Sequence, residues 1–143
     1  MRVSELGREG RGHTSSLIFE TGDKVVETLE GHARRTGMKA AHFVALGAFE
    51  SATLAYFDWK KKDYIEIPVE EQVEVTSLVG NIGTHDGTPA IHIHCVLARR
   101  DGSTVAGHLM EAEVRPTLEL FLTAYDDQLV RRTDEDSGLP LIR

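Results

Sequence analysis

The sequence predicts an α+β fold, a mixed, largely antiparallel sheet with one main helix packed on it. Three observations support this prediction. Apolar residues recur at the helical spacing of about 3.6 residues in one segment only. Most other segments alternate with the period of two that is typical of strands, or are apolar throughout. The chain has 143 residues, 41% hydrophobic and 27% charged, which is enough to bury one core and unlike a disordered chain.

The chain begins with a charged stretch. Residues 1–12 carry glycines and charged side chains without apolar periodicity, which predicts a flexible N-terminal lead. This stretch lacks the apolar segment of a secretory signal, and no run approaches the roughly 18 to 20 apolar residues that cross a bilayer. We therefore expect a single domain over residues 13–143, in a cytoplasmic protein with no membrane partner.

The helix is predicted at residues 23–36. Val25, Leu29 and Ala33 recur there at helical spacing, and Gly37 is a natural stop. Polar residues in the turn before this segment could cap its first N–H groups. The opposite face is charged, so we expect the helix to bury one face only.

Strands fill most of the remaining chain. They are predicted at residues 14–20, 40–49, 51–57, 64–69, 72–79, 89–98, 104–114 and 118–125, with one more short strand near 129–132. The glycine-rich segment 80–87 predicts a turn between strands. It does not fit a nucleotide-binding loop, because no helix follows it.

The net charge and the cysteine content exclude some classes of function and site. The net charge is -7, from 16 basic and 23 acidic residues, which argues against strong non-specific binding to DNA, since such binding requires a basic surface. The single cysteine, Cys95, excludes an intrachain disulfide and a four-cysteine zinc site.

Two histidines share one face of a predicted strand. His92 and His94 are two residues apart within 89–98, so their side chains point the same way, with Cα atoms about 6.5 to 7 Å apart. Cys95 points to the other face, where it suits a small buried apolar side chain better than a ligand. The pair predicts either a metal site or two hydrogen-bonded side chains in a cleft.

A third histidine joins this pair if the next hairpin has the right register. A two-residue Asp101-Gly102 loop turns His108 to the other face, whereas a three-residue loop over 100–102 places it opposite His94. The alternation of the following residues favours the three-residue loop. Three imidazoles with an open fourth position suit zinc or a related divalent ion. We therefore take His92, His94 and His108 as candidate metal ligands.

The sequence assigns no catalytic residue. A cupin-like metal enzyme also uses His-x-His on a strand, but the glutamate expected four or five residues later is replaced by Ala98 and Arg99. A zinc hydrolase would need a general base. Glu111 is nearest in sequence and is predicted on the opposite face, which leaves Asp86 or Glu74.

Several motifs, in a fixed order, resemble the plant and prokaryote conserved (PPC) domain. They are Leu46-Gly47-Ala48, Gly80-Asn81-Ile82, Asp86-Gly87, His92-x-His94, Asp101-Gly102, Gly107-His108-Leu109 and Ser137-Gly138-Leu139-Pro140. The resemblance covers residues 13–140. It implies a sheet with one main helix, assembly as a homotrimer, and a three-histidine site with which metal is associated in prokaryotic members.

The resemblance also raises a DNA-associated regulatory role, because the plant members follow AT-hook motifs. No AT-hook core is present here, and the segment at 71–76 that matches the plant partner-binding motif keeps only Glu74. The resemblance and the histidine pattern together imply a stand-alone, homotrimeric binding protein with a divalent metal, zinc by its ligands, that either holds the structure or binds a small-molecule ligand. The alternative is a small metal-dependent hydrolase or lyase that uses metal-bound water.

Overall fold

Nine strands and one helix form in the part of the chain that the structure describes, residues 1–9 and 12–143 of a computed structural model. The elements in order are β1 (Arg2–Glu9), β2 (Gly12–Glu20), α1 (Val25–Thr36), β3 (Ala41–Asp58), β4 (Asp63–Val69), β5 (Val73–His85), β6 (Thr88–Ala98), β7 (Thr104–Tyr125), β8 (Val130–Thr133) and β9 (Pro140–Ile142). The prediction of one main helix with a sheet is confirmed.

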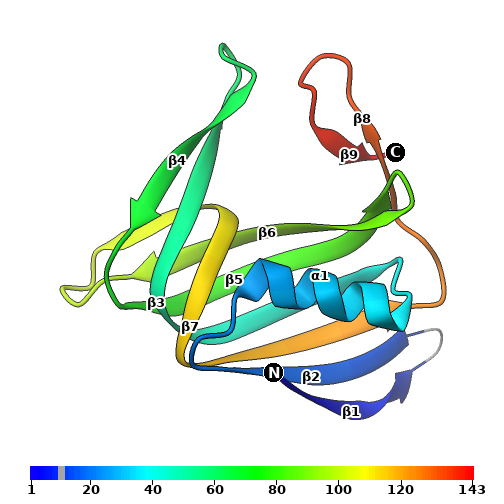
Figure 1. Ribbon diagram of the computed structural model, residues 1–143, viewed down its shortest axis with the longest axis horizontal. Coiled ribbons are helices and arrows are strands. Elements are labelled where there is room, and N and C mark those ends of the chain that lie inside the picture. Colours follow the sequence, from blue (N-terminus) through cyan, green and yellow to red (C-terminus); the bar gives the residue numbers. More distant parts are fainter. Residues whose placement is uncertain (10–11) are drawn as a thin grey trace.

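The strands form one sheet that curls on itself (Figure 1). Its order is β1-β2-β7-β3-β5-β8-β9, and β6 pairs with both β5 and β7. Since β3 also pairs with β5 and β7, these four strands close a ring of hydrogen bonds. The pairing of β5 with β8 is parallel and the other strand pairings of the described chain are antiparallel, so the prediction of a mixed, largely antiparallel sheet is confirmed.

Two predicted strand breaks are absent. The segments 40–49 and 51–57 belong to one 18-residue strand, β3, and the segments 104–114 and 118–125 belong to the 22-residue β7. Register shifts between Gly47 and Ser51 bend the pairing of β3 with β7 without ending it. A β-bulge allows this, because one extra residue turns the strand while the ladder continues on both sides. Figure 1 shows the long, bent strands that result.

The glycine-rich segment 80–87 is mostly strand, which corrects the predicted turn. β5 continues to His85, and the turn consists of Asp86 and Gly87, both at positive φ (50° and 79°). Gly80 lies inside the strand, and the position requires glycine because the surrounding atoms leave no room for a side chain. A Cβ there would lie 2.3 Å from the Phe43 ring and 2.7 Å from the carbonyl oxygen of His92.

The N-terminal stretch contains a strand that the sequence analysis did not predict. Where a flexible lead was expected over residues 1–12, β1 pairs antiparallel with β2; residues 10 and 11 lie outside the described residues. An edge strand needs only backbone hydrogen bonds to its neighbour, so its sequence can lack apolar alternation. The Met1 ammonium also lies 2.9 Å from the carboxylate of Asp23.

The helix covers the inner face of the sheet and packs against β6 and β7. Val25, Leu29 and Ala33 are fully buried, as predicted, and Gly37 ends the helix in the left-handed conformation with φ 66°. In the described part of the chain no helix has the length and apolar character to span a bilayer. The buried core of the inner face includes Phe19, Phe43, Phe49, Leu54, Leu78, Ile82, Ile93, Leu97, Leu118 and Leu120.

The N-terminus of the helix is capped from the sheet. The cap position, Lys24, makes no side-chain cap hydrogen bond. Instead, the carboxylate of Glu111 on β7 accepts hydrogen bonds from the N–H groups of Val26 (2.8 Å) and Glu27 (3.1 Å). These N–H groups belong to the first turn, which has no partner inside the helix.

Candidate metal centre

His92 and His94 project from β6 on the face away from the helix. Ile93 and Cys95, the residues that alternate with them, are 1% and 3% exposed in the core. The predicted facing of the pair is therefore confirmed, as is the burial of Cys95. Burial raises the pKa of the Cys95 thiol to about 12, so this cysteine is a neutral apolar side chain near pH 7.

The hairpin between β6 and β7 has the three-residue loop. Arg99 donates its N–H to the carbonyl of Ser103 at 2.8 Å, and Gly102 adopts the left-handed conformation with φ 83°. This register places His94 directly opposite His108, as predicted. Gly107, next to His108, allows a close approach of β3, since a Cβ there would lie 2.8 Å from the carbonyl oxygen of Ala55.

The regular alternation predicted beyond His108 is wrong. The alternation over residues 108–114 that favoured the three-residue loop would place Ala112 and Val114 on the face of His108, but they are 2% and 0% exposed in the core. The cause is a bulge, because Leu109 and Glu111 pair with consecutive residues of β3 and leave Met110 as an extra residue. The bulge brings the Glu111 carboxylate to the start of the helix.

The three imidazoles form one cluster. Each offers a ring nitrogen, and the three nitrogens lie within 4.8 Å of one another; this is the one such group among the described histidines, cysteines and acidic residues. The Nε2 atoms of His92 and His94 are 3.2 Å apart. Two nitrogens bound tetrahedrally at the usual zinc distance lie about 3.3 Å apart. The pair is therefore spaced as two zinc ligands are, while the same distance also allows a hydrogen bond between the rings.

The electrostatics of the cluster favour neutral rings at His92 and His108. Burial, reinforced by the other two histidines and by Arg131, lowers the pKa of His108 to about 4. Burial, His94 and Arg131 likewise lower the pKa of His92. The Nδ1 atom of His108 is buried without a hydrogen-bond partner in the described structure. Neutral imidazole is the form that binds metal, so the donor set fits a divalent ion.

A cavity of about 570 Å³ opens beside the cluster. The β3–β4 hairpin supplies an aromatic wall, in which Tyr64 stacks on His108 with ring centroids 4.9 Å apart. The C-terminal hairpin of β8 and β9 supplies the opposite side, and both hairpins rise from the same side of the sheet in Figure 1. Besides the three histidines the lining consists of Ala55, Tyr56, Phe57, Trp59, Tyr64, Ala90, Ile91, Gly107, Arg131, Leu139, Pro140 and Leu141.

Arg131 is a charged lining residue that the sequence analysis did not identify. It lies on β8 and is 7% exposed. Its guanidinium donates hydrogen bonds to the side-chain carbonyl of Asn81 and, at 3.1 Å, to the carbonyl of Pro140. Asn81 pairs directly with His92 across β5 and β6, which places the guanidinium close to the cluster. No sequence motif marks Arg131, because β8 is a short strand in a polar segment.

The carboxylates considered as general bases lie elsewhere. Glu111 caps the first turn of the helix and does not line the cavity beside the histidines. Asp86 occupies the β5–β6 turn with its side chain 90% exposed. Glu74 lines a different depression, together with Arg99 and Arg100. The structure brings none of these three to the histidine cluster.

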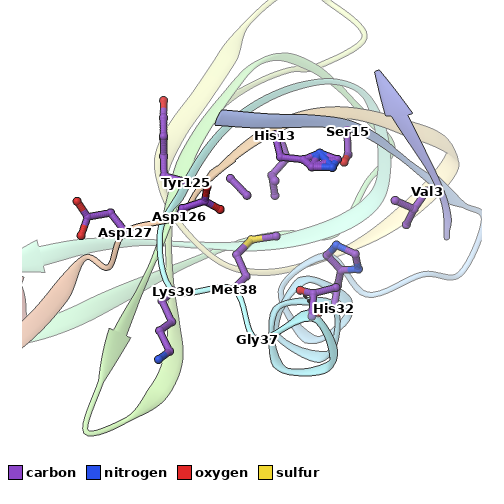
Figure 2. Close-up of a pocket in the computed structure, with 13 residues that line it drawn as sticks. Val3, His13, Ser15, His32, Gly37, Met38, Lys39, Tyr125, Asp126 and Asp127 are labelled. Atoms are coloured by element: carbon purple, nitrogen blue, oxygen red, sulfur yellow. Dashed lines mark hydrogen bonds between the residues drawn. The ribbon is translucent and has the colours of Figure 1, made fainter. Parts of the chain in front are cut away.

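A second cavity, of about 520 Å³, lies at the C-terminal end of the helix (Figure 2). Figure 2 shows Met38 near its centre, with His13 from β2 and His32 from α1 beside it, while Lys39 and Asp127 point outward. His13 and His32 belong to no three-residue group of metal-binding side chains among the described residues. This cavity therefore lacks the ligand set of the first one.

Comparison with known proteins gives consistent matches over nearly the whole chain. The family model described as the Plants and Prokaryotes Conserved (PCC) domain matches residues 7–126; this is the PPC family named above. No curated protein matches the sequence significantly.

Solved structures are similar in both sequence and fold. A metal-containing protein from Archaeoglobus fulgidus is 34% identical with a TM-score of 0.85, covering 100% of this chain and 99% of that one. A PPC protein from Pyrococcus horikoshii is 28% identical with a TM-score of 0.86, covering 99% and 94%. A protein from Bacteroides thetaiotaomicron, provisionally described as DNA-binding, is 26% identical with a TM-score of 0.87, covering 99% and 96%.

Proposed function

This chain belongs to the plant and prokaryote conserved domain family, and on that basis we propose that it is a cytoplasmic, homotrimeric binding protein that holds a divalent metal ion, zinc, at His92, His94 and His108. The observation that carries the proposal is the convergence of three ring nitrogens within 4.8 Å at the edge of an open cavity. An ion held by three neutral imidazoles keeps an open position for a ligand. The printed name of the Archaeoglobus fulgidus relative, a metal-containing protein, supports the same function.

Binding is favoured over the hydrolase or lyase alternative by the surroundings of the cluster. Water activated by a metal transfers its proton to a nearby base during hydrolysis. Glu74 and Asp86, which the sequence offered for that role, do not line the described cavity, and neither does Glu111, the acidic residue nearest in sequence. The aromatic and apolar walls instead suit the retention of a small molecule.

Metal analysis of the purified protein tests the site. We expect about one zinc per chain in the wild type and close to none in a His92→Ala/His94→Ala double variant. A His42→Ala/His85→Ala double variant is the matched control, because it also loses two histidines but none from the cluster. Equal zinc in the wild type and the first variant would refute the proposed metal site.

The proposed trimer is supported by an exposed apolar row on the outer face of the sheet. Val79, Val44 and Phe121 are direct neighbours across β5, β3 and β7 and are 50%, 50% and 43% exposed. A continuous apolar surface of this kind is typical of a contact between proteins. Sedimentation equilibrium should give a mass of three chains, and a monomer would contradict the proposal.

A DNA-associated role, raised by the provisional description of the Bacteroides thetaiotaomicron relative, has a separate test. The net charge of -7 opposes non-specific contact with phosphates. We expect no change in fluorescence anisotropy of labelled duplex DNA at low salt, with or without zinc. Saturable binding that weakens as salt rises would assign the protein to DNA instead.

A further inference from the structure

The cavity beside the histidine cluster contains a buried positive charge without a counter-charge. Arg131 is 7% exposed, and Arg131 and Ser137 are the buried polar or charged residues of the described chain. Its hydrogen-bond acceptors are the neutral oxygens of Asn81 and Pro140. None of the ion pairs among the described residues includes Arg131.

The guanidinium also has spare hydrogen-bonding capacity. Its Nε is buried without an acceptor in the described structure. Burial lowers the pKa of Arg131, as expected for a charge removed from water without a partner. Buried charges are normally paired, because the desolvation cost of a lone charge amounts to several kcal/mol. Arg131 is therefore free to pair with an anion supplied from outside the chain.

The position of Arg131 defines where that anion binds. Arg131 lines the same cavity as the three histidines, and its charge contributes to the lowered pKa of both His92 and His108. A divalent ion on the histidines and the nearby guanidinium repel each other, which weakens metal binding. An anion between the two positive groups would offset this repulsion, because it is attracted by both.

The other walls of the cavity indicate what kind of molecule carries the anionic group. Phe57, Trp59 and Tyr64 form one side, with Phe57 edge-on to both other rings at centroid distances of 5.5 and 5.3 Å. Leu139 and Leu141 lie on the other side. Such walls bind an apolar or aromatic body, and a single guanidinium matches a planar carboxylate, which it binds by charge-assisted hydrogen bonds.

We propose that this cavity binds a small organic carboxylate with an apolar body, whose carboxylate lies between Arg131 and the metal ion. The inference rests on the proposed metal site and adds the chemical class of its ligand. It also makes metal and carboxylate binding mutually dependent, because each relieves the repulsion that opposes the other. By linkage, the carboxylate strengthens metal binding by the same factor by which the metal strengthens carboxylate binding.

The experiment uses the full chain loaded with Co²⁺, whose visible spectrum reports changes in its ligands. Benzoate serves as the carboxylate probe, and benzamide, which has the same shape but no charge, serves as its control. We expect benzoate to change the spectrum saturably and benzamide to leave it unchanged at the same concentrations. We also expect benzoate to tighten Co²⁺ binding to the wild-type protein.

Arg131→Gln tests the residue itself. The loss of charge-assisted hydrogen bonds should weaken benzoate binding by about tenfold or more. Arg132→Gln is the matched control, since Arg132 is the next residue on β8 and is exposed, and it should bind benzoate as the wild type does. If Arg131→Gln fails to fold, Arg131→Lys, which keeps the charge, takes its place. The tightening of Co²⁺ binding by benzoate in the wild-type protein then still decides whether the carboxylate inference holds.

The outcomes separate the two proposals. Failure of the wild type to bind Co²⁺ or Zn²⁺ would refute the metal site. Three results would overturn the carboxylate inference and leave the metal site intact. They are Co²⁺ binding without any spectral response to benzoate, equal responses to benzoate and benzamide, and tighter binding of inorganic phosphate than of benzoate. Unchanged benzoate affinity in a folded Arg131→Gln variant would also overturn it.

Discussion

The carboxylate of Glu111 on β7 accepts a hydrogen bond of 2.8 Å from the backbone N–H of Val26 in the first turn of the helix. A residue 85 positions away in sequence therefore caps the helix, and the cap fastens the helix to the sheet. The negative charge also suits this end of the helix, where the macrodipole is positive.

Glu111→Ala should lower the free energy of unfolding by about 1 to 2 kcal/mol, because two helix N–H groups lose their acceptor. Zinc content should not change, since the side chain is bonded to the start of the helix and does not line the cavity beside the histidines. Urea denaturation measures the effect.

Glu113→Ala is the matched control on the same strand. Glu113 pairs with Lys24 at 2.6 Å and both side chains are partly exposed, so water screens the pair and its loss should lower the free energy of unfolding by much less than the loss of Glu111. An equal loss of stability in both variants would contradict the capping role of Glu111.

Gly107→Ala should destabilise the protein by about 1 to 3 kcal/mol, because the new Cβ would meet the carbonyl oxygen of Ala55 at 2.8 Å. The strain lies next to His108, so the variant should also bind zinc more weakly. Thermal unfolding with and without zinc checks both effects.

The same substitution in the helix should have the opposite sign. At Gly31 a Cβ would meet only the flexible end of Arg35, at 3.2 Å, and alanine favours a helix by about 0.5 to 1 kcal/mol over glycine. Gly31→Ala should therefore raise the midpoint of unfolding. Two variants that shift it in the same direction would contradict the packing assigned to Gly107.

The metal-free protein should lose stability as the pH falls from about 6.5 to 4. Burial lowers the pKa of His108 from 6.5 to about 4, so between these values the unfolded chain binds more protons than the folded one. The contribution of His108 is fully present above pH 6.5 and is lost as the pH falls through this window.

His108→Phe keeps a ring against Tyr64 and removes the titrating group. Urea denaturation at pH 7 and pH 5, with a chelator present, should show a smaller stability difference in this variant than in the wild type. Part of the difference will remain, because burial also lowers the pKa of His92. The same difference in both proteins would contradict the burial of His108 in the folded state.

Val44→Glu should convert the proposed trimer into monomers, because it places a charge in the centre of the exposed apolar row formed with Val79 and Phe121. Ile65→Glu is the control, since Ile65 is 42% exposed on β4, outside that row. Sedimentation equilibrium should find one chain for the first variant and three for the second. A trimer in both would place the contact elsewhere.

Local sequence periodicity was enough to predict the helix and the facing of the histidines. Val25, Leu29 and Ala33 mark the buried face of the helix because side-chain direction repeats every 3.6 residues along it. His92 and His94 share a face for the same reason with period two. The Asp101-Gly102 sequence pointed to the hairpin that brings in the third histidine, and the predicted register is the observed one, although the alternation that favoured it breaks at the bulge after His108.

Contacts between distant parts of the chain could not be predicted in this way. The glycine-rich segment 80–87 was interpreted as a turn, although Gly80 is enclosed by Phe43 and the backbone of His92. That enclosure exists only after β3, β5 and β6 have paired. The bulge at Met110 likewise depends on the partner strand, since it is defined by two-against-one pairing.

The sequence by itself determined which residues could bind a metal and that they lie on neighbouring strands, because both follow from spacing within one hairpin. Only the tertiary structure decided what surrounds them. Arg131 and the aromatic wall reach the cluster because two hairpins, far apart in sequence, rise from the same side of the curled sheet. The periodicity of side-chain direction predicts structure over a few neighbouring residues only. The charge and shape of the cavity depend instead on which strands pair and on where their hairpins lie in the sheet.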